Sequence, residues 1–430
     1  MSSFSPKFSR RQILAGATIA AGSFAIPHIA RAQAAAGRVV VIGGGFGGAT
    51  AARYIKLFSP DTDVVLVERD ANYITCPFSN YVLGGIRDIN SITHRRDPLR
   101  QRHGVRLVRG EASAVDTTAR SVRLKDGSSL PYDRLVVAPG IELNFGGVAG
   151  WSEQAANTVM PHAWKAGAQT LLLRKQLEAM PDGGTVIVAP PANPFRCPPG
   201  PYERVSMIAW YLKTKKPKSK ILVLDAKDAF SKQGLFMAGW ESQYPGMITW
   251  VAGKDGGKVE SVDPKSMTVT AGFGKEKGAV VNIIPPQTAG KIALDAGLAE
   301  SNGWCAVDPA SFASRKAANV YVLGDASIAG AMPKSGTAAN SQAKVVAAQV
   351  AAGLRGVTAP AAVFHNTCYS LVTPDYGISV TGTYRPGPQG VAEVPSSGGV
   401  SPGNANAAQR KAEADFTLGW YAGIIADTFG

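Results

Sequence analysis

Short apolar runs bounded by glycine, proline or charged residues recur along this chain and predict buried strands. They are rich in valine, isoleucine and leucine and show little polar alternation, as expected for strands of a parallel sheet. The clearest runs are "RVVVI" at 38–42, "LVVA" at 135–138, "VIVA" at 186–189, "ILVL" at 221–224 and "VYVL" at 320–323. Because helix-like stretches separate them, we predict an α/β fold with two Rossmann-like dinucleotide-binding domains.

The first run opens a complete dinucleotide-binding pattern. Residues 38–70 contain an apolar strand, a G-x-G-x-x-G turn at Gly43, Gly45 and Gly48, an alanine-rich helix and a second strand that ends in Glu68. The first glycine permits a tight turn, the second lets backbone approach a pyrophosphate, and the third lets the helix pack on the strand. Glu68 stands where a carboxylate accepts ribose hydroxyls. We therefore predict that this segment binds a dinucleotide.

Two later segments favour FAD over NAD. "YDRLVVAPG" at 132–140 and "AANVYVLGDAS" at 317–327 occur in the order of the additional FAD signatures of two-dinucleotide-domain flavoprotein reductases, which they resemble. That resemblance implies that Asp325 binds the ribityl chain. The helical sequence that follows would point its positive end at the flavin pyrimidine. The residues expected at FAD are Gly43, Gly45, Phe46, Gly48, Glu68, Arg69, Val115, Ala138, Gly140, Asp325 and Gly336.

These motifs divide the chain into domains, as its length of 430 residues also leads us to expect. The FAD-binding domain is predicted in two parts, residues 33–150 and 290–360. A second, degenerate NAD-like domain, residues 151–289, is inserted between them. Residues 361–430 are expected to form a C-terminal α+β interface domain.

The N-terminal residues have the features of a targeting segment. "SRRQIL" at 9–14 is a twin-arginine pattern, and a weakly apolar stretch leads from it to the small-residue site around Ala30 and Ala32. We predict a signal peptide over residues 1–32 and export of the folded protein to the periplasm. Export in the folded state suits a protein whose cofactor is inserted beforehand.

Composition and charge narrow the possible partners. The chain is 45% apolar and 18% charged, as in an ordinary globular protein. No apolar run reaches the ~18 residues of a membrane span, so we expect no transmembrane anchor. The formal net charge is +14, and it falls to +10 without the four basic residues of the signal peptide. The remaining basic residues are spread thinly, so we do not expect nucleic acid as a partner.

The four cysteines show no metal-binding spacing. Cys76, Cys197, Cys305 and Cys368 form no C-x-x-C motif, and we expect no metal site. The oxidising periplasm would permit disulfides. Four cysteines allow three complete pairings, and the spacing does not choose among them.

The turn after the strand at 186–189 departs from the dinucleotide pattern. Six prolines surround Cys197, and Gly200 is the one glycine, where a second G-x-G-x-x-G is expected. Proline offers no N–H to a phosphate, and its ring blocks close backbone approach. We therefore expect that NADH is not the reductant.

Three cysteine motifs together resemble the flavoprotein subunit of flavocytochrome c sulfide dehydrogenase. They are "NYITCPFSNYVLGG" at 72–85, "NPFRCPPGPYER" at 193–204 and "FHNTCYSL" at 364–371. The resemblance covers essentially the whole mature chain. It implies that Cys76 is joined covalently to the flavin 8α-methyl, that Cys197 and Cys368 form a redox-active disulfide over the flavin, and that Glu203 acts as acid or base.

The same resemblance implies a partner and a reaction. The chain has no C-x-x-C-H motif, and the family carries haem c on a separate cytochrome c subunit, so we predict a heterodimer. Hydrosulfide would attack the disulfide to leave a persulfide. The released cysteine would attack flavin C4a and pass two electrons to FAD, which would release them singly to the cytochrome.

Other interpretations stay open. The bridge between Cys197 and Cys368 could be purely stabilising, and Cys76 could be a buried free thiol. Cys305 fits a buried apolar residue, and a lone histidine such as His365 is more often structural than a base.

Three other functions compete with this one. A sulfide:quinone oxidoreductase shares the FAD domain and the sulfur chemistry but delivers electrons to membrane quinone, usually with amphipathic C-terminal helices. A non-catalytic flavin protein for redox sensing or docking would carry a cysteine pair that ignores sulfide. A type II NADH dehydrogenase would need the second glycine-rich turn.

Overall fold

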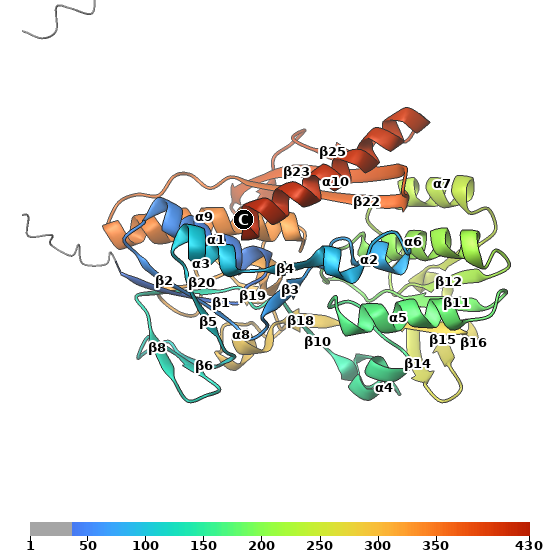
Figure 1. The fold of residues 1–430 in the computed structure, drawn as a ribbon, viewed down its shortest axis with the longest axis horizontal. Helices are drawn as coiled ribbons and strands as arrows, with labels where there is room; N and C mark the ends of the chain where they lie inside the picture. The colour runs from blue at the N-terminus through green and yellow to red at the C-terminus, as the bar shows by residue number, and fades with distance from the viewer. Residues whose placement is uncertain (1–36) are drawn as a thin grey trace, which may run out of the picture. The chain divides into compact units, whose positions relative to one another are not determined.

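Five parallel strands form the first sheet, in the order β20-β9-β1-β2-β5. The computed structural model describes residues 37–430, so the predicted signal peptide at 1–32 lies outside the described residues. The strands are β1 (Arg38–Ile42), β2 (Asp63–Glu68), β5 (Arg106–Arg109), β9 (Arg134–Val137) and β20 (Val320–Val322). β20 pairs with β9, Val320 facing Leu135, so segments far apart in the sequence build one sheet (Figure 1).

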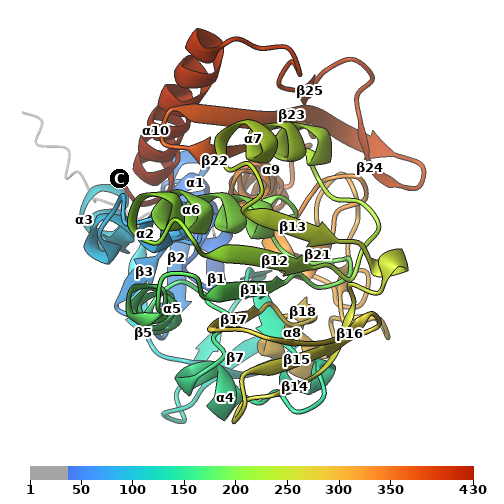
Figure 2. The ribbon, with the colours of Figure 1, turned by 90° about the vertical axis from the view of Figure 1, so that its right-hand side faces the viewer.

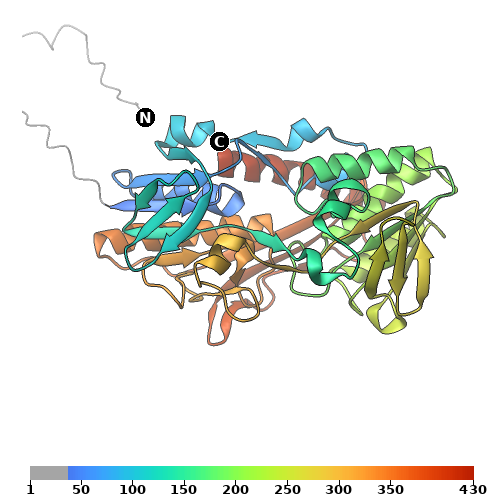
Figure 3. The same ribbon diagram turned by 90° about the horizontal axis from the view of Figure 1, so that it is seen from below.

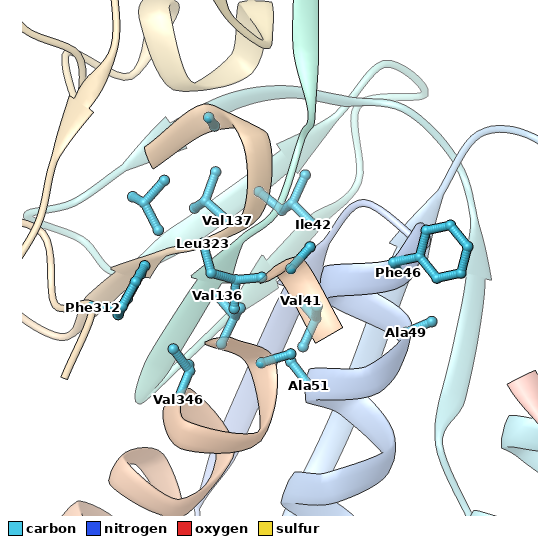
Figure 4. Packing of buried hydrophobic residues seen from close by; sticks show 14 of the residues in the cluster. Val41, Ile42, Phe46, Ala49, Ala51, Val136, Val137, Phe312, Leu323 and Val346 are labelled. Atoms are coloured by element: carbon cyan, nitrogen blue, oxygen red, sulfur yellow. The ribbon is translucent and has the colours of Figure 1, made fainter. Parts of the chain in front are cut away.

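Alanine-rich faces bring the helices α1 (Phe46–Phe58) and α9 (Gly336–Arg355) together beside this sheet. A Cβ on Gly47 would lie 2.4 Å from Leu323 Cδ1, so the close packing of α1 requires a glycine. Figure 4 shows part of the buried cluster, including Val41, Ile42, Phe46, Ala49, Ala51, Val136, Val137, Phe312, Leu323 and Val346. This core holds the loops at the carboxyl ends of the strands in place.

The second sheet has four parallel strands in the order β13-β12-β11-β17. They are β11 (Thr185–Ala189), β12 (Lys220–Leu224), β13 (Ile248–Val251) and β17 (Val280–Ile283). Val186 and Val188 face the cluster made with α5 (Ala168–Ala179), α6 (Gly200–Lys215) and α7 (Gln233–Gln243). Ile187 and Ala189 face β14 (Val259–Asp263) and β15 (Thr268–Ala271) on the other side (Figure 2). Both faces are therefore covered, which explains the continuous apolar run.

The C-terminal region is an antiparallel sheet with one long helix. β22 (Phe364–Thr373) pairs with β23 (Tyr376–Gly387), which also pairs with β24 (Gly390–Glu393) and β25 (Gly399–Val400). The helix α10 (Ala407–Phe429) packs along β23. A Cβ on Gly377 would lie 2.4 Å from Ala414 N, so this packing depends on glycine.

Smaller elements complete the fold. They are β3 (Asn72–Ile74), β4 (Thr93–Arg95), β6 (Ala112–Asp116), β7 (Ser121–Leu124), β8 (Ser129–Pro131), β10 (Ile141–Leu143), β16 (Gly274–Lys277), β18 (Gln287–Ala289), β19 (Cys305–Ala306), β21 (Ser327–Ile328), α2 (Ser79–Leu83), α3 (Asp97–His103), α4 (Glu153–Thr158) and α8 (Lys291–Asp295). In Figure 3 the gold and orange segments lie beside the blue N-terminal strands, and the green and yellow segments gather apart from them. Over residues 37–430, no helix is long and apolar enough to cross a membrane. The predicted α/β fold with two Rossmann-like sheets and a C-terminal α+β region is confirmed.

Candidate active site

A cavity of about 1100 Å³ collects residues from several parts of the fold. Loops at the carboxyl ends of the first sheet line it, together with the proline-rich turn, the start of α9, and side chains of β22 and α10. Open α/β sheets bind ligands at this edge. The predicted residues that line the cavity are Cys76, Cys197, Cys368, Glu203, Gly43, Gly45, Phe46, Glu68, Arg69, Ala138, Gly140, Asp325 and Gly336.

Two predicted cofactor residues, Gly48 and Val115, do not line the cavity. A Cβ on Gly48 would lie 1.8 Å from Gly43 O, so this glycine serves the close packing of α1 on the sheet. Val115 faces Val122 in the β6–β7 pair, and β6 reaches the cavity only at its start. Val115 therefore lies outside the cavity lining, and its contact with FAD stays a prediction.

The glycine-rich turn forms the nucleotide end of the cavity. Gly43 has φ +95°, and a Cβ there would lie 2.3 Å from Ala138 O, so only glycine fits. Within residues 37–430 no side chain caps α1, which leaves the N–H groups of its first turn for an anion. Glu68 accepts hydrogen bonds from Gly44 N–H (2.7 Å) and Asp70 N–H (3.1 Å). These bonds hold the carboxylate at the cavity wall.

Arg96 is a cavity residue to which no sequence motif pointed. Its Nε donates to Gly44 O (2.7 Å), its Nη1 donates to Asp70 O (2.8 Å), and its Nη2 lies 3.6 Å from Glu68 Oε2. Burial lowers the pKa of the guanidinium, and Glu68 opposes that shift. The group remains a cation at neutral pH. It adds positive charge beside the turn that would receive a pyrophosphate.

Asp325 has the surroundings of a ligand-facing carboxyl group. Its buried Oδ1 has no hydrogen-bond partner among the described residues, and Oδ2 lies 4.0 Å from Arg196 Nη1. Burial raises the pKa of Asp325, and the charges of Arg196 and Lys334 oppose the shift. A buried oxygen without a donor is unfavourable. A ribityl hydroxyl would supply the missing donor.

Cys76 lies in the loop between β3 and α2 and lines the cavity. Its Sγ lies 3.3 Å from Trp164 O. The same carbonyl accepts a hydrogen bond from the Arg196 guanidinium. The sulfur therefore lies near the half-buried Arg196 guanidinium, which also lies 4.0 Å from Asp325.

Cys197 is held by the proline-rich turn in a left-handed backbone conformation. Its φ is +58°, a region that costs a non-glycine residue roughly 1–3 kcal/mol. Its N–H donates to Lys334 O (2.7 Å), and its carbonyl accepts from Gly200 N–H (2.8 Å). A Cβ on Gly200 would lie 2.8 Å from Cys197 Sγ, so glycine is required where α6 begins. The turn thus fixes the position of the sulfur.

Cys368 reaches the same cavity from β22. All four cysteines are free thiols in this structure. Cys197 and Cys368 therefore correspond to the reduced form of the predicted pair, and their disulfide stays a prediction. Burial raises the pKa of the Cys197 thiol, and negative charge on Cys368 and Glu203 raises it further.

Glu203 lines the cavity from the first turn of α6. Its Oε2 accepts from Asn80 Nδ2 (2.8 Å), and its Oε1 accepts from Leu371 N–H (3.1 Å). Burial raises the pKa of Glu203, and the two hydrogen bonds oppose the shift. A carboxyl group whose pKa moves toward neutrality beside two thiols can take up or release a proton.

Arg204, the residue after Glu203 in α6, also lines the cavity. The side chain is 2% exposed, and it donates to Asn80 Oδ1 (3.2 Å), His162 O (2.7 Å) and Ala163 O (2.6 Å). Burial lowers the pKa of Arg204 to about 10, so the guanidinium stays charged. Because Asn80 Oδ1 accepts from Arg204, its Nδ2 is directed at Glu203. Sequence motifs gave no indication of this role.

The carboxylate that follows β12 is satisfied by the protein's own donors. Asp225 accepts from Tyr202 Oη (2.5 Å), Trp250 Nε1 (3.0 Å) and Lys227 Nζ (2.6 Å), and it is fully buried. A carboxylate at this place in a dinucleotide unit binds ribose. Because the Asp225 carboxylate already accepts from protein donors, and because the turn after β11 is rich in proline, we do not expect a nicotinamide dinucleotide to bind at the second sheet.

Cys305 and His365 lie outside the cavity lining. Cys305 is buried in β19, where burial raises its thiol pKa to about 11. His365 is exposed on β22, and its Nε2 lies 3.0 Å from Thr367 Oγ1. Among residues 37–430, no group of three or more His, Cys, Asp or Glu side chains is placed to hold a metal ion.

The residues present fit FAD. The uncapped start of α1 and Arg96 suit a pyrophosphate, Glu68 suits a ribose, and the unpartnered Asp325 Oδ1 suits a polyol. Gly336 begins α9 at the cavity without a side chain of its own. FAD would therefore be held by the first sheet and α9.

Three family models match this chain. "Pyridine nucleotide-disulphide oxidoreductase" matches residues 37–172, "Sulfide dehydrogenase [flavocytochrome c] flavoprotein chain, central" matches 170–285, and "Flavocytochrome c sulphide dehydrogenase, flavin-binding" matches 360–429. The last two describe the regions that contribute Cys197 and Cys368.

Individual relatives agree with these matches. The sulfide dehydrogenase [flavocytochrome c] flavoprotein chain of Chlorobaculum thiosulfatiphilum is 56% identical over 45 residues, 10% of this chain and 94% of that one. The sulfide-quinone reductase of Aquifex aeolicus is 28% identical over 183 residues, 43% of this chain and 41% of that one. The type II NADH:quinone oxidoreductase NdhA of Mycobacterium tuberculosis is 36% identical over 114 residues, 26% of this chain and 24% of that one. The chain thus spans less than half the length of the latter two.

A solved structure shares the fold over most of the chain. The sulfide:quinone oxidoreductase from Aquifex aeolicus superposes with a TM-score of 0.69 at 19% identity, covering 91% of this chain and 92% of that one. The resemblance carried by the three cysteine motifs is confirmed by the family models and by the Chlorobaculum relative. The chain belongs to the family of flavocytochrome c sulfide dehydrogenase flavoprotein chains.

Proposed function

We propose that this chain oxidises hydrosulfide as the flavoprotein subunit of a heterodimer with a cytochrome c. The observation that carries the proposal is the meeting of Cys197, Cys368 and Glu203 in one cavity with the residues that fit FAD. A small, soft anion needs no large recognition surface, only an electrophilic sulfur within reach. The pair would provide that sulfur in its disulfide form.

The reaction proposed for the protein's own residues is one thiol–disulfide exchange. Hydrosulfide attacks a sulfur of the Cys197–Cys368 disulfide, one cysteine becomes a persulfide and the other is released as a thiolate. Glu203 accepts the proton of H2S when that form enters, because its carboxyl lines the same cavity as the two sulfurs and its pKa is raised by burial. Arg204 and Asn80 hold Glu203 in place through the hydrogen bonds described above.

FAD, when bound, supplies the chemistry of accepting an electron pair and releasing it in single-electron steps. We propose that Cys76 holds it through an 8α-S-cysteinyl link. The position of Cys76 on the cavity wall, beside Arg196, supports this assignment. Haem c would belong to the partner subunit, since the sequence has no C-x-x-C-H motif.

The proposed place of this reaction is the periplasm. The twin-arginine pattern at 9–14 supports export of the folded, flavin-loaded protein. Fusion of residues 1–36 to a reporter, with Arg10 and Arg11 replaced by lysine in a matched fusion, tests the address. Retention of the reporter inside the cell only when Arg10 and Arg11 are replaced by lysine would support the predicted export.

Sulfide:quinone oxidoreductase activity is the second candidate, because the Aquifex sulfide-quinone reductase resembles this chain in sequence and fold. The two functions differ in the electron acceptor. Oxidised cytochrome c and a short-chain quinone, offered separately to the sulfide-treated protein, distinguish them. Faster reoxidation by the quinone than by cytochrome c would favour the second candidate.

Anaerobic titration tests the central proposal. Sulfide, and in a parallel sample NADH, is added to the purified holoprotein while the flavin absorbance is followed. We expect bleaching by sulfide, and we expect its loss in Cys197→Ser and Cys368→Ser. Bleaching by NADH alone would contradict the proposal, and a cysteine pair that ignores sulfide would point to a non-catalytic flavin protein.

A further inference from the structure

The two cavity cysteines have different surroundings. Cys368 is buried in β22, whereas Cys197 is partly exposed in the proline-rich turn, and both line the cavity. In an exchange reaction, the rate depends on which sulfur is accessible and on how well the other sulfur bears negative charge as it leaves. The groups around each sulfur therefore bear on the direction of attack.

A hydrogen-bond chain from α9 ends on the Cys368 sulfur. Ser335 Oγ accepts from Ala338 N–H (3.0 Å) and donates to Asn366 Oδ1 (2.5 Å). Cys368 Sγ lies 3.5 Å from Asn366 Nδ2 and 3.7 Å from Asn366 Oδ1, so the thiol can donate to Oδ1, whereas a thiolate would accept from Nδ2. Asn366 is 1% exposed, so its amide is fixed by protein partners. A fixed donor of this kind stabilises negative charge on the sulfur.

Lys232 places a positive charge behind the same strand. Its Nζ donates to Cys368 O (2.9 Å), Ser370 Oγ (2.9 Å) and Ile378 O (3.4 Å). Burial lowers the pKa of Lys232 to about 8, and negative charge on Cys368 and Glu203 opposes the shift. The ammonium therefore predominates at neutral pH. It fixes the backbone of Cys368 and favours an anion on this side of the pair.

The groups around Cys197 disfavour a negative charge on its sulfur. Desolvation by the surrounding protein atoms and the negative charges of Cys368 and Glu203 raise its thiol pKa, and the charge of Arg196 opposes that shift. A thiolate released at Cys197 would therefore be less stable than a neutral sulfur bonded there. The residue Cys197 nevertheless keeps some exposed surface, whereas Cys368 is buried, and attack is expected at the residue that the cavity reaches more openly.

We propose that the pair reacts with one polarity: hydrosulfide attacks Sγ of Cys197, and Cys368 leaves as the thiolate. This inference rests on the proposed disulfide chemistry. The bond between the two cysteine sulfurs breaks, a bond forms between the incoming sulfur and Cys197, and the electron pair of the broken bond stays on Cys368. The product is a persulfide at Cys197, and Asn366 and Lys232 are positioning residues for the leaving group.

Site-resolved trapping tests the polarity. The oxidised holoprotein is mixed anaerobically with one equivalent of sodium sulfide, or of methanethiol in a second arm, quenched at once with excess iodoacetamide at neutral pH, and mapped by peptide mass spectrometry. Methanethiol gives a mixed disulfide whose outer sulfur bears a methyl group. Because that sulfur has no S–H group, it cannot form a bridge between the two cysteines. We expect the persulfide and the methylthio group on Cys197, and simple alkylation on Cys368.

The opposite distribution would overturn the inference while leaving the proposed function intact. An intact disulfide after both treatments would instead remove the proposed function, and the inference with it. The two failures are therefore distinguishable in the same peptide map.

Variants test the role of the hydrogen-bond chain. Asn366→Leu removes the donor, and Ser335→Ala frees the Asn366 amide to turn without changing the core. We expect cleavage of the disulfide by methanethiol to slow by about tenfold in Asn366→Leu, with a larger share of methylthio groups on Cys368. His365→Leu, an exposed position on the same strand, is the matched control. Unchanged rate and unchanged distribution in both Asn366→Leu and Ser335→Ala would overturn the inference.

Discussion

Asn80 donates a hydrogen bond from Nδ2 to Oε2 of Glu203 over 2.8 Å, inside the cavity that Cys197 and Cys368 line. This bond holds the carboxyl group at the cavity, and burial raises its pKa. A group with these properties would exchange protons at a pH closer to neutrality than an ordinary glutamate does.

Glu203→Gln is expected to slow flavin reduction by sulfide by about 100-fold, as is typical for loss of a general base. The wild-type rate should rise with pH through the raised pKa of Glu203, because the carboxylate is the form that accepts a proton. Stopped-flow absorbance across this range checks both points. Glu241→Gln, on an exposed position of α7, controls for the ionisation of sulfide itself, which affects both proteins equally. If the rate of flavin reduction fell toward low pH in Glu203→Gln in the same way as in the wild type, Glu203 would be excluded as the base.

Cys76→Ala is expected to release flavin on denaturation, whereas flavin should stay with the wild-type polypeptide. The reason is the proposed thioether to FAD, which acid and detergent do not break. Gel fluorescence of denatured samples measures the retained flavin. Cys305→Ala replaces a buried thiol outside the cavity and should retain flavin. Free flavin in denatured wild-type protein would rule out the link.

Tyr202→Phe is expected to lower the free energy of unfolding by about 2 kcal/mol, because buried Asp225 loses one of its donors. We do not expect the variant to gain reduction by NADH, since the proline-rich turn is unchanged. Urea denaturation and an anaerobic NADH titration measure the two effects. Tyr211→Phe is the control, because among the described residues the Tyr211 hydroxyl makes no hydrogen bond to a buried carboxylate, and the Tyr211 ring contacts Arg174 instead. Bleaching by NADH in the variant would show that the Asp225 site is still a nucleotide site.

His162 should make the fold sensitive to acid. Burial, and then the positive charge of Arg204, lower its pKa to about 3, and its Nδ1 accepts from Trp164 N–H (2.8 Å). The unfolded state takes up a proton near pH 6.5, so stability is fully present above this value. It falls by up to about 1.4 kcal/mol per pH unit as the pH drops from about 6.5 toward 3.

His162→Asn keeps an acceptor without the titrating ring, so its urea midpoint should depend less on pH in this window. His365→Asn, at an exposed position, should follow the wild type. Equal slopes of the urea midpoint against pH for wild type and His162→Asn would contradict the role assigned to His162. Comparing slopes removes the contribution of carboxyl groups that all three proteins share.

Sequence patterns located the parts of the site that repeat a known backbone geometry. Gly43 and Glu68 could be assigned because a tight turn and a ribose acceptor occupy fixed places in a βαβ unit. Cys76, Cys197 and Cys368 could be assigned because their motifs resemble a family, and the fold brings all three to one cavity. The prediction for Val115 had no such geometric basis, and the residue lies outside the cavity lining.

The remaining site residues depend on tertiary contacts that no spacing encodes. Arg96 meets Gly44 across a loop, and Asn366 gains its orientation from the cap of a helix in another segment. Lys232 contacts Cys368 only because α7 packs against β22. Such partners are separated by tens to hundreds of positions along the chain and have no local signature.

The cavity wall has a consequence for when the cofactor can be captured. Gly43 stands near the start of the described chain and Trp420 near its end, and both line the same space. A ribosome that has not yet released the segment through Trp420 therefore holds a nascent chain with an incomplete wall. Flavin loading is expected to be post-translational, and a cell that ran short of flavin would accumulate full-length apoprotein rather than truncated holoprotein.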